Sequence, residues 1–312
     1  MLVGSTGGLN RPASVSWSPD GRFIALVNYY ANTSRIFSFN GSGDPVLVGT
    51  VGGLSGPSSI SWSPDGRFLA VVNVNKLQIY AFDGVNDPIQ FGVTTNTMTG
   101  SYNVSWSPSG AFIAVASINA LQIFSFNEDS NPIQIGITDP ILSAPQSAAW
   151  SPDGRFIAVV NFNDNTLKTF SFNGNGNPIL VGNTLTGNLP ISAAWSPDEH
   201  FIASVNQGSY TLQIFSFDET GNPISIGDVP TENSPTSVSW SSNGKFIALT
   251  NGSSQTLQIF KVNYIPNHSL QAISNGIGFG DSALGANYDA TVNILAGANV
   301  LVDGLINYDC VN

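Results

Sequence analysis

Few side chains in this sequence belong to the types that most often carry catalysis. The chain has two histidines, His200 and His268, and a single cysteine, Cys310. Only the turn acids Asp198 and Glu199 stand near His200, and His268 has no metal-type ligand close to it in sequence. Zinc-protease, Cys-x-x-Cys, serine-hydrolase and phosphate-loop motifs are absent. We therefore expect no catalytic residue, no metal site and no cofactor.

Neutral polar residues, in contrast, recur at two fixed positions. One set stands three residues before each tryptophan, and the other ends the apolar segment that follows. The first set is Ser14, Ser59, Asn103, Ser147, Ser192 and Ser237, and the second is Asn28, Asn73, Asn161, Asn206 and Asn251. Serine and asparagine often cap backbone groups in loops. The same hydroxyls and amides could also bind a neutral ligand, such as a glycan or a peptide.

These positions belong to a repeat of about 45 residues. Six segments resemble Ser61 to Asn73, SWSPDGRFLAVVN, and they contain all six tryptophans. Successive tryptophans are 45, 44, 44, 45 and 45 residues apart. A period in this range is typical of arrays in which each repeat buries its apolar face against the next. The repeats therefore share one core, and we expect residues 1–312 to form a single domain.

Each repeat reads as four short strands. In the first, Val15 and Trp17 alternate with serines, which is the two-residue period of a strand. Pro-Asp-Gly then predicts a tight turn. A second apolar run, a third segment of the type LQIFSF and a fourth of the type NPILVG complete the unit. No unit has the 3.6-residue period of an amphipathic helix. Four antiparallel strands per repeat predict an all-β fold, the β-propeller.

The sequence leaves two alternatives for the number of blades. Six regular repeats span residues 14–263, and the residues from 268 to 312 still read as strands without a tryptophan. We expect this segment to be a divergent seventh blade, with residues 1–4 as the N-terminal strand that closes the ring. The alternative is a six-bladed ring, closed by the same strand, with a β-rich tail.

Composition restricts the partners. Charged residues make up only 9% of the chain and the formal net charge is −11. Nucleic acid and anionic membranes require concentrated positive charge, so we expect neither as a partner. No apolar run is long enough for a membrane span, and the first residues lack the features of a signal peptide. We expect a monomer, and the sequence does not predict a cell compartment.

The segments SPDGRFIA, Val-Asn and LQIFSFN resemble the repeats of WD-repeat and lactonase-type propellers. The Gly-His and Trp-Asp pairs of WD-repeat units are missing, and the Val-Asn ending of the second strand is closer to the lactonase type. These families include both interaction scaffolds and lactone hydrolases, so the resemblance implies the fold and leaves the activity open.

A lactonase-type centre would need acids or histidine at the mouth of the channel. Asp139, Asp164, Asp228 and Glu232 lie in loops near that face, but at irregular positions. We therefore expect a non-enzymatic scaffold that binds a protein or a peptide. The alternatives are a lectin-like binder of neutral glycans and a lactonase-type hydrolase.

Overall fold

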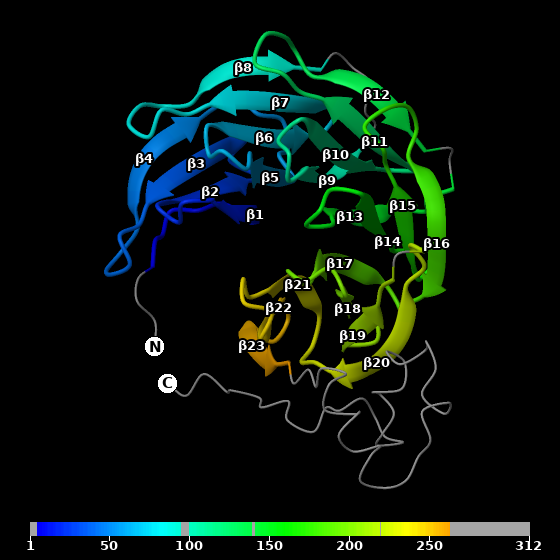
Figure 1. The fold of residues 1–312 in the computed structure, drawn as a ribbon. Coiled ribbons are helices and arrows are strands. Elements are labelled where there is room, and N and C mark those ends of the chain that lie inside the picture. Colours follow the sequence, from blue (N-terminus) through cyan, green and yellow to red (C-terminus); the bar gives the residue numbers. More distant parts are fainter. Residues whose placement is uncertain (1–4, 95–99, 139–140, 219, 263–312) are drawn as a thin grey trace, which may run out of the picture.

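The computed structural model describes residues 5–94, 100–138, 141–218 and 220–262. Within these residues all regular structure is β-strand, arranged in six antiparallel sheets around a centre (Figure 1). The sheets follow one another along the chain, and we call them blades 1 to 6. No helix in this part of the chain is both long and apolar enough to cross a membrane.

The first three blades contain twelve strands. Blade 1 consists of β1 (Pro12–Trp17), β2 (Phe23–Asn28), β3 (Thr33–Ser38) and β4 (Val46–Val51). Blade 2 consists of β5 (Ser59–Trp62), β6 (Phe68–Asn73), β7 (Lys76–Ala81) and β8 (Ile89–Val93). Blade 3 consists of β9 (Ser101–Trp106), β10 (Phe112–Ser117), β11 (Ala120–Ser125) and β12 (Ile133–Ile137).

The last three blades repeat this order. Blade 4 consists of β13 (Pro145–Trp150), β14 (Phe156–Asn161), β15 (Thr166–Ser171) and β16 (Ile179–Leu185). Blade 5 consists of β17 (Pro190–Trp195), β18 (Phe201–Asn206), β19 (Thr211–Ser216) and β20 (Ile224–Pro230). Blade 6 consists of β21 (Pro235–Trp240), β22 (Phe246–Asn251) and β23 (Thr256–Lys261).

The turn between the first two strands of a blade forms for local reasons. In blade 1 the amide of Ser18 donates to the carbonyl of Phe23 at 2.8 Å, and the amide of Gly21 donates back to Ser18 at 2.9 Å. Gly21 has a φ of +71°, which favours glycine because it has no Cβ. The Pro-Asp-Gly sequence therefore ends the first strand and starts the second.

Tryptophan fills the space between neighbouring blades. Between blades 2 and 3, Trp106 packs with Phe68, Leu77 and Phe126 in one buried cluster. Its ring is edge-on to that of Phe126, with centroids 4.9 Å apart. The indole Nε1 also donates to the carbonyl of Ser61 in blade 2, at 3.2 Å. Each tryptophan after the first thus joins its blade to the preceding one.

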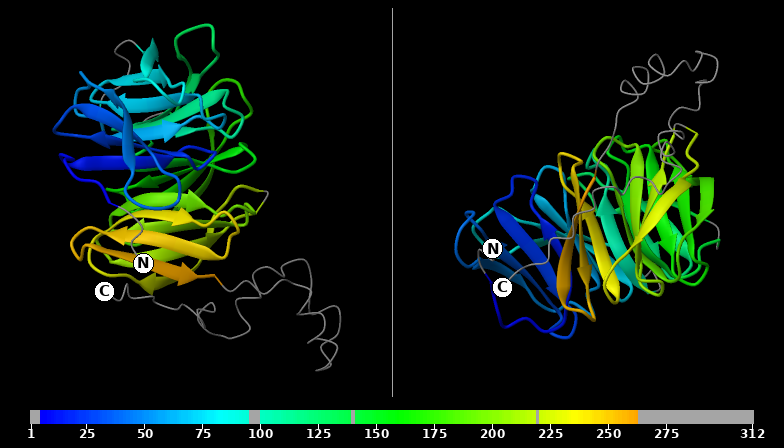
Figure 2. Two further views of the ribbon diagram at one scale, coloured as in Figure 1. Left: turned by 90° about the vertical axis from the view of Figure 1, so that its left-hand side faces the viewer. Right: turned by 90° about the horizontal axis from the view of Figure 1, so that it is seen from below.

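The architecture confirms the predicted all-β propeller of four-stranded antiparallel blades. The described residues form six blades, and blade 6 has three strands there. The expected closing strand, residues 1–4, and the expected last blade, residues 268–312, lie outside the described residues. Figures 1 and 2 show blade 1 and blade 6 as the two ends of an incomplete ring.

Candidate functional site

The strand order gives the propeller two different faces. One face carries the loops that lead into the first strand of each blade and the hairpins between second and third strands; we call it the mouth face. The other carries the Pro-Asp-Gly turns and is called the turn face. Both recurring sets of serine and asparagine residues lie toward the mouth face, at the ends of the two inner strands.

The serine set joins adjacent blades. Five of its six members accept a hydrogen bond from a backbone amide in the first strand of the next blade, at 3.1 to 3.4 Å. The five pairs are Ser14 with Ile60, Ser59 with Val104, Asn103 with Ala148, Ser147 with Ala193, and Ser192 with Val238. Ser237, on the last described blade, is exposed. These contacts are those of backbone-capping residues, so ligand binding by this set stays a prediction.

The asparagine set is buried beneath the mouth face. In blades 1 and 4, Asn28 and Asn161 donate through Nδ2 to a threonine that starts the third strand. Their Oδ1 atoms accept the amides of Asn10 and Ser143 in the entry loops, at 3.3 and 3.4 Å. These two side chains therefore hold the entry loop against the second strand. Ligand binding by the asparagines likewise stays a prediction.

Blades 5 and 6 depart from this arrangement. In blade 6 the amide of Asn233 donates to Ser254 Oγ at 3.0 Å, and in blade 5 the amide of Asn188 donates to Ser209 Oγ at 3.1 Å. In blades 1 and 4 the equivalent amide donates to the asparagine Oδ1. In blades 5 and 6 the serine takes this amide, so the asparagine Oδ1 loses its donor. The Oδ1 atoms of Asn206 and Asn251 are buried and accept no hydrogen bond. A buried carbonyl oxygen without a donor is costly and suits an enclosed water.

The carboxylate of Glu232 belongs to the polar network of blade 6. Glu232 is half-buried in the entry loop before β21. Its Oε2 accepts from Thr256 Oγ1 at 2.9 Å, and its backbone amide donates to Gln258 Oε1 at 3.0 Å. Asn251 Nδ2 donates to both Thr256 Oγ1 and Gln258 Oε1. One carboxylate oxygen is thus linked through the hydroxyl of Thr256 to the side-chain amide of Asn251.

Blade 5 contains the same frame without the carboxylate. Gln213 Oε1 accepts the amide of Gly187 at 2.9 Å, and Asn206 Nδ2 donates to Thr211 and Gln213. Gly187 thus stands where blade 6 has Glu232. The comparison separates two roles, because the glutamine accepts an entry-loop amide in both blades whereas only blade 6 adds an acid.

Blade 4 replaces this glutamine with a buried cation. The Nζ of Lys168 donates to Thr166 Oγ1 at 3.2 Å and lies 3.9 Å from the exposed carboxylate of Asp164. Burial lowers the pKa of Lys168, and the nearby Asp164 carboxylate opposes that shift. The ammonium is therefore a partly compensated positive charge below the mouth face.

The remaining residues that the sequence marked for chemistry are dispersed. Asp228 is exposed on β20, opposite Gln213 in the strand register. His200 lies on the turn face, where its Nδ1 is 2.6 Å from the carbonyl of Asp198. Asp139, His268 and Cys310 lie outside the described residues. The described part of the chain contains no group of three or more potential histidine, cysteine or acidic metal ligands.

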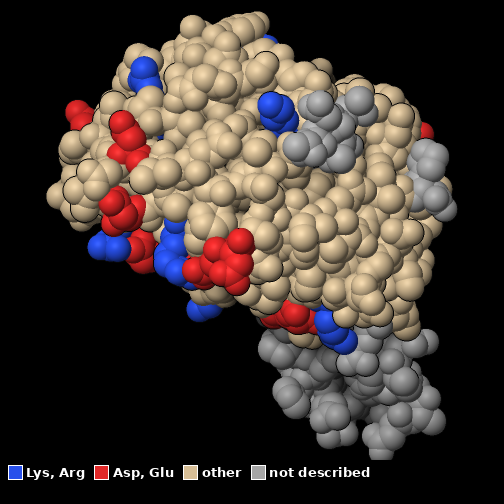
Figure 3. Space-filling view, turned by 90° about the horizontal axis from the view of Figure 1, so that it is seen from above, with Lys and Arg blue, Asp and Glu red and all other residues tan. Residues whose placement is uncertain are grey.

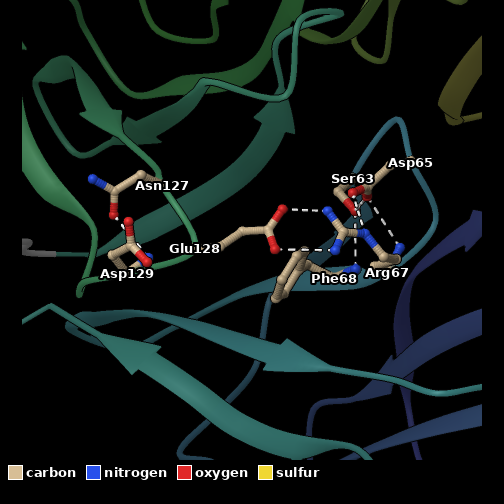
Figure 4. A network of polar contacts seen from close by, with 7 residues as sticks. All are labelled: Ser63, Asp65, Arg67, Phe68, Asn127, Glu128 and Asp129. Atoms are coloured by element: carbon tan, nitrogen blue, oxygen red, sulfur yellow. Dashed lines mark hydrogen bonds and ion pairs between the residues drawn. The ribbon is translucent and has the colours of Figure 1, made fainter.

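The turn face carries the expected pairs of acidic and basic residues. In blade 2, Asp65 Oδ1 accepts from the amide of Arg67, and Arg67 Nε lies 2.8 Å from Asp65 Oδ2 (Figure 4). The same guanidinium also contacts both carboxylate oxygens of Glu128 in blade 3 (Figure 4). These side chains are exposed, so each pair contributes little to stability. They stabilise the turns and connect blade 2 to blade 3.

The turn acids predict a loss of stability in acid. Hydrogen bonds from Ser18 and Arg22 lower the pKa of Asp20 from 3.8 to about 2. A carboxylate with a depressed folded-state pKa stabilises the fold above its unfolded value, and this contribution disappears as the pH falls toward 2. The melting temperature should therefore fall between pH 4 and pH 2. Thermal unfolding should show a shallower fall for Asp20→Asn, and an unchanged slope would contradict the assignment.

Sequence reasoning included Glu232 among the irregular acids but did not find its network or Lys168. The signal for Lys168 was present in the aligned third strands, where Thr166-Leu-Lys stands against Thr211-Leu-Gln and Thr256-Leu-Gln. The network of Glu232 joins residues 24 and 26 positions apart. Only the observed register brings them together.

Comparisons with known proteins agree on the fold. The family model described as "Lactonase, 7-bladed beta-propeller" matches residues 146–228 and 195–269, and no curated protein matches the chain. A putative 6-phosphogluconolactonase from Bacteroides fragilis has a TM-score of 0.73 at 17% identity, covering 83% of this chain and 82% of that one. The periplasmic gluconolactonase of Pseudomonas aeruginosa has a TM-score of 0.72 at 19% identity, covering 83% of each chain.

Similarity extends to the other family that the repeats resemble. The β-propeller domain of Myceliophteria thermophila Cps50 (Swd1) has a TM-score of 0.67 at 12% identity, covering 81% of this chain and 83% of that one. The expectation that the protein is not an enzyme requires correction, because the matching family model is that of lactonases and similar structures include lactonases. A scarcity of histidine does not exclude an enzyme, since a carboxylate alone can move a proton.

Proposed function

We propose that this protein is a lactonase-type hydrolase that opens a neutral sugar lactone, with Glu232 as the base that activates water. The observation that carries the proposal is the lactonase family match to residues 146–269, a stretch that contains Glu232 and its entire network. The scaffold and lectin functions lack a comparable observation. The similar solved structures include proteins described as gluconolactonases, which supports the same substrate class.

The residues around Glu232 suit this chemistry. The hydroxyl of Thr256 fixes one carboxylate oxygen, which leaves the other to accept a proton from water. The water oxygen then forms a bond to the lactone carbonyl carbon, and the ring C–O bond breaks. The ring oxygen takes up a proton and becomes a hydroxyl, so the product is a hydroxy acid. The Oδ1 of Asn251 is buried and accepts no hydrogen bond within the described residues, so it suits an enclosed water beneath the site.

Charge favours a neutral substrate over a phosphorylated one. The formal net charge of −11 repels a dianion. Charged side chains are sparse on the side of the molecule that Figure 3 shows, with no extended basic region there. Among the cations toward the mouth face, Lys168 contacts Thr166 and Asp164, and the Arg35 guanidinium donates to the carbonyl of Gly8 at 2.9 Å. The Arg11 guanidinium lies over the rings of Tyr29 and Tyr30, and Lys76 is exposed.

The direct test is acid release from glucono-δ-lactone and from its 6-phosphate, measured by pH-stat above the spontaneous rate. We expect turnover of the neutral lactone. The kcat/KM for the phosphate ester should be lower by a factor of about ten or more. A preference for the phosphate ester would contradict the expected selectivity for a neutral substrate, but not the lactonase activity itself. Absence of hydrolysis with both lactones and with a γ-lactone panel would contradict the proposed activity, and a glycan array would then test the lectin alternative.

A further inference from the structure

One arginine on the mouth face differs from the others in its partners. The chain contains five arginines, all within the described residues. On the turn face Arg22, Arg67 and Arg155 each pair with an aspartate two residues before them. Arg35 donates to a backbone carbonyl. The fifth, Arg11, is exposed, and within the described residues its guanidinium makes no hydrogen bond or ion pair.

Two tyrosine rings hold this guanidinium in place. The Cζ of Arg11 lies 4.6 Å from the centroid of the Tyr29 ring and 5.0 Å from that of the Tyr30 ring. The two rings are edge-on to each other, with centroids 5.4 Å apart. The amide of Tyr29 also donates to the carbonyl of Arg11 at 3.0 Å. A cation–π contact restrains a guanidinium without consuming its N–H donors, so these donors stay available to a ligand.

The repeat sets the position of Arg11 but not its side chain. In every blade the equivalent entry-loop residue has a φ between +51° and +61°. In five blades its carbonyl accepts the amide that opens the hairpin between second and third strands, at 2.7 to 3.2 Å. The six equivalent residues are Arg11, Gly56, Gly100, Ala144, Leu189 and Ser234. Only blade 1 therefore places a charge at this point of the mouth face.

The mouth-face loops around Arg11 carry positive charge only. The entry loops and hairpins of blades 1 and 2 contain two cations, Arg11 and Lys76, and no acid. These segments are residues 5–12, 28–33, 52–58 and 73–76. The mouth-face acids Asp164 and Glu232 belong to the loops of blades 4 and 6 instead. A local positive potential favours an anion here, although the net charge of the chain is −11.

The loops of blades 1 and 2 meet beside the tyrosines. A Cβ added at Gly56, in the entry loop of blade 2, would lie 3.4 Å from the Tyr29 ring and 3.2 Å from Val74. The exposed Lys76 follows Val74 by two residues. Tyr30 is 63% exposed, which leaves much of its ring open to a ligand. Most other residues in these loops are Ser, Thr, Asn or Gly, and they suit hydroxyl groups better than apolar peptide side chains.

We propose that Arg11, Tyr30 and Lys76 form a binding site for an acidic sugar, with a uronate unit as the ligand. The guanidinium of Arg11 binds the uronate carboxylate through two N–H···O bonds. The Tyr30 ring packs against the C–H face of the sugar, and Lys76 attracts the carboxylate of a neighbouring unit. The site does not rest on the proposed lactonase activity, because it uses blades 1 and 2 and none of the residues around Glu232.

Isothermal titration calorimetry of the full chain with trigalacturonate tests this site. The fully methyl-esterified trisaccharide is the matched ligand, because it keeps the sugar rings and loses the negative charge. We expect the acid form to bind, and the ester to bind more weakly by a factor of about ten or more. Affinity for the acid form should fall as salt is added, because the Debye length shrinks to about 3 Å at 1 M. Equal binding of both forms, or no binding of the acid form, would overturn the proposal.

Two variants and a second ligand locate the site and identify its chemistry. Arg11→Gln should weaken trigalacturonate binding by a factor of about ten or more, and Tyr30→Ala by a factor of about three or more. Arg22→Gln is the matched control: the Arg22 guanidinium also lies over a ring, that of Phe23 at 5.3 Å, but it pairs with Asp20 on the turn face. It should bind as the parent chain does, and equal losses in both arginine variants would contradict the location. A capped triglutamate peptide presents carboxylates without sugar rings, so equal affinity for it would assign the site to an acidic protein segment and overturn the proposal.

Discussion

Replacing Glu232 with glutamine is expected to lower kcat/KM for glucono-δ-lactone by about 10²-fold or more, because general-base catalysis contributes at least that factor. Glutamine keeps a carbonyl oxygen that can accept from Thr256, so the fold and the loop should be preserved. Steady-state kinetics and a melting curve measure the two effects separately. Glu128→Gln is the control, because Glu128 lies on the turn face beside Arg67.

A pair of threonine variants distinguishes positioning of the acid from support of the fold. Thr256→Val removes the hydroxyl that holds Glu232 Oε2, and Thr211→Val removes the equivalent hydroxyl in blade 5, where glycine replaces the acid. We expect kcat to fall about tenfold in Thr256→Val only, since misplacement of a base by a fraction of an ångström is costly. Equal kinetics for the two variants, or full activity in Glu232→Gln, would remove Glu232 from the mechanism.

Truncating a buried tryptophan should have the largest effect on stability. Trp106→Ala is expected to lower the free energy of unfolding by about 3–5 kcal/mol, because it leaves a cavity between blades 2 and 3. The loss also removes the Nε1 bond to Ser61. Urea unfolding followed by circular dichroism measures the change. A cost below about 1 kcal/mol would mean that the blades repack around the cavity.

Tyr30→Ala provides the comparison for this experiment. Tyr30 is an aromatic residue in a mouth-face hairpin and is 63% exposed, although its ring lies edge-on to Tyr29. Its truncation should cost well under the tryptophan value, since little apolar area leaves the core. Comparable costs for the two variants would contradict the assignment of the tryptophan as a core residue.

The fold could be predicted because it depends on local patterns that repeat. The alternation of Val15 and Trp17 with serines gave the strand and its two sides, and Pro-Asp-Gly gave the turn. The structure confirms both, with Ser14 facing blade 2 and Trp62 packed against blade 1. Each of these inferences needed only neighbours in sequence and the tryptophan period.

The candidate site could be predicted only in part, because it arises where the repeats differ. The sequence predicts Glu232 near the mouth face, as the structure has it. The hydrogen bonds that position Glu232 come from Thr256 and Gln258, which the register of blade 6 brings to it. The asparagines were recognised as a recurring set, but their different hydrogen bonding was not visible. Asn161 Oδ1 accepts the entry-loop amide of Ser143. In blade 6 the equivalent amide, that of Asn233, donates to Ser254 instead, so Asn251 Oδ1 accepts no hydrogen bond.

The hydrogen bond that a serine-set residue accepts from the next blade has a consequence for how the chain reaches its native order. Neighbouring units present nearly the same surface, so the contact between Ser14 and Ile60 would form almost as well between blades that are not consecutive. Only the short connecting loops then select the correct neighbour. Chains with such interchangeable units are prone to misassembly, in which a blade of one molecule inserts into another at high concentration.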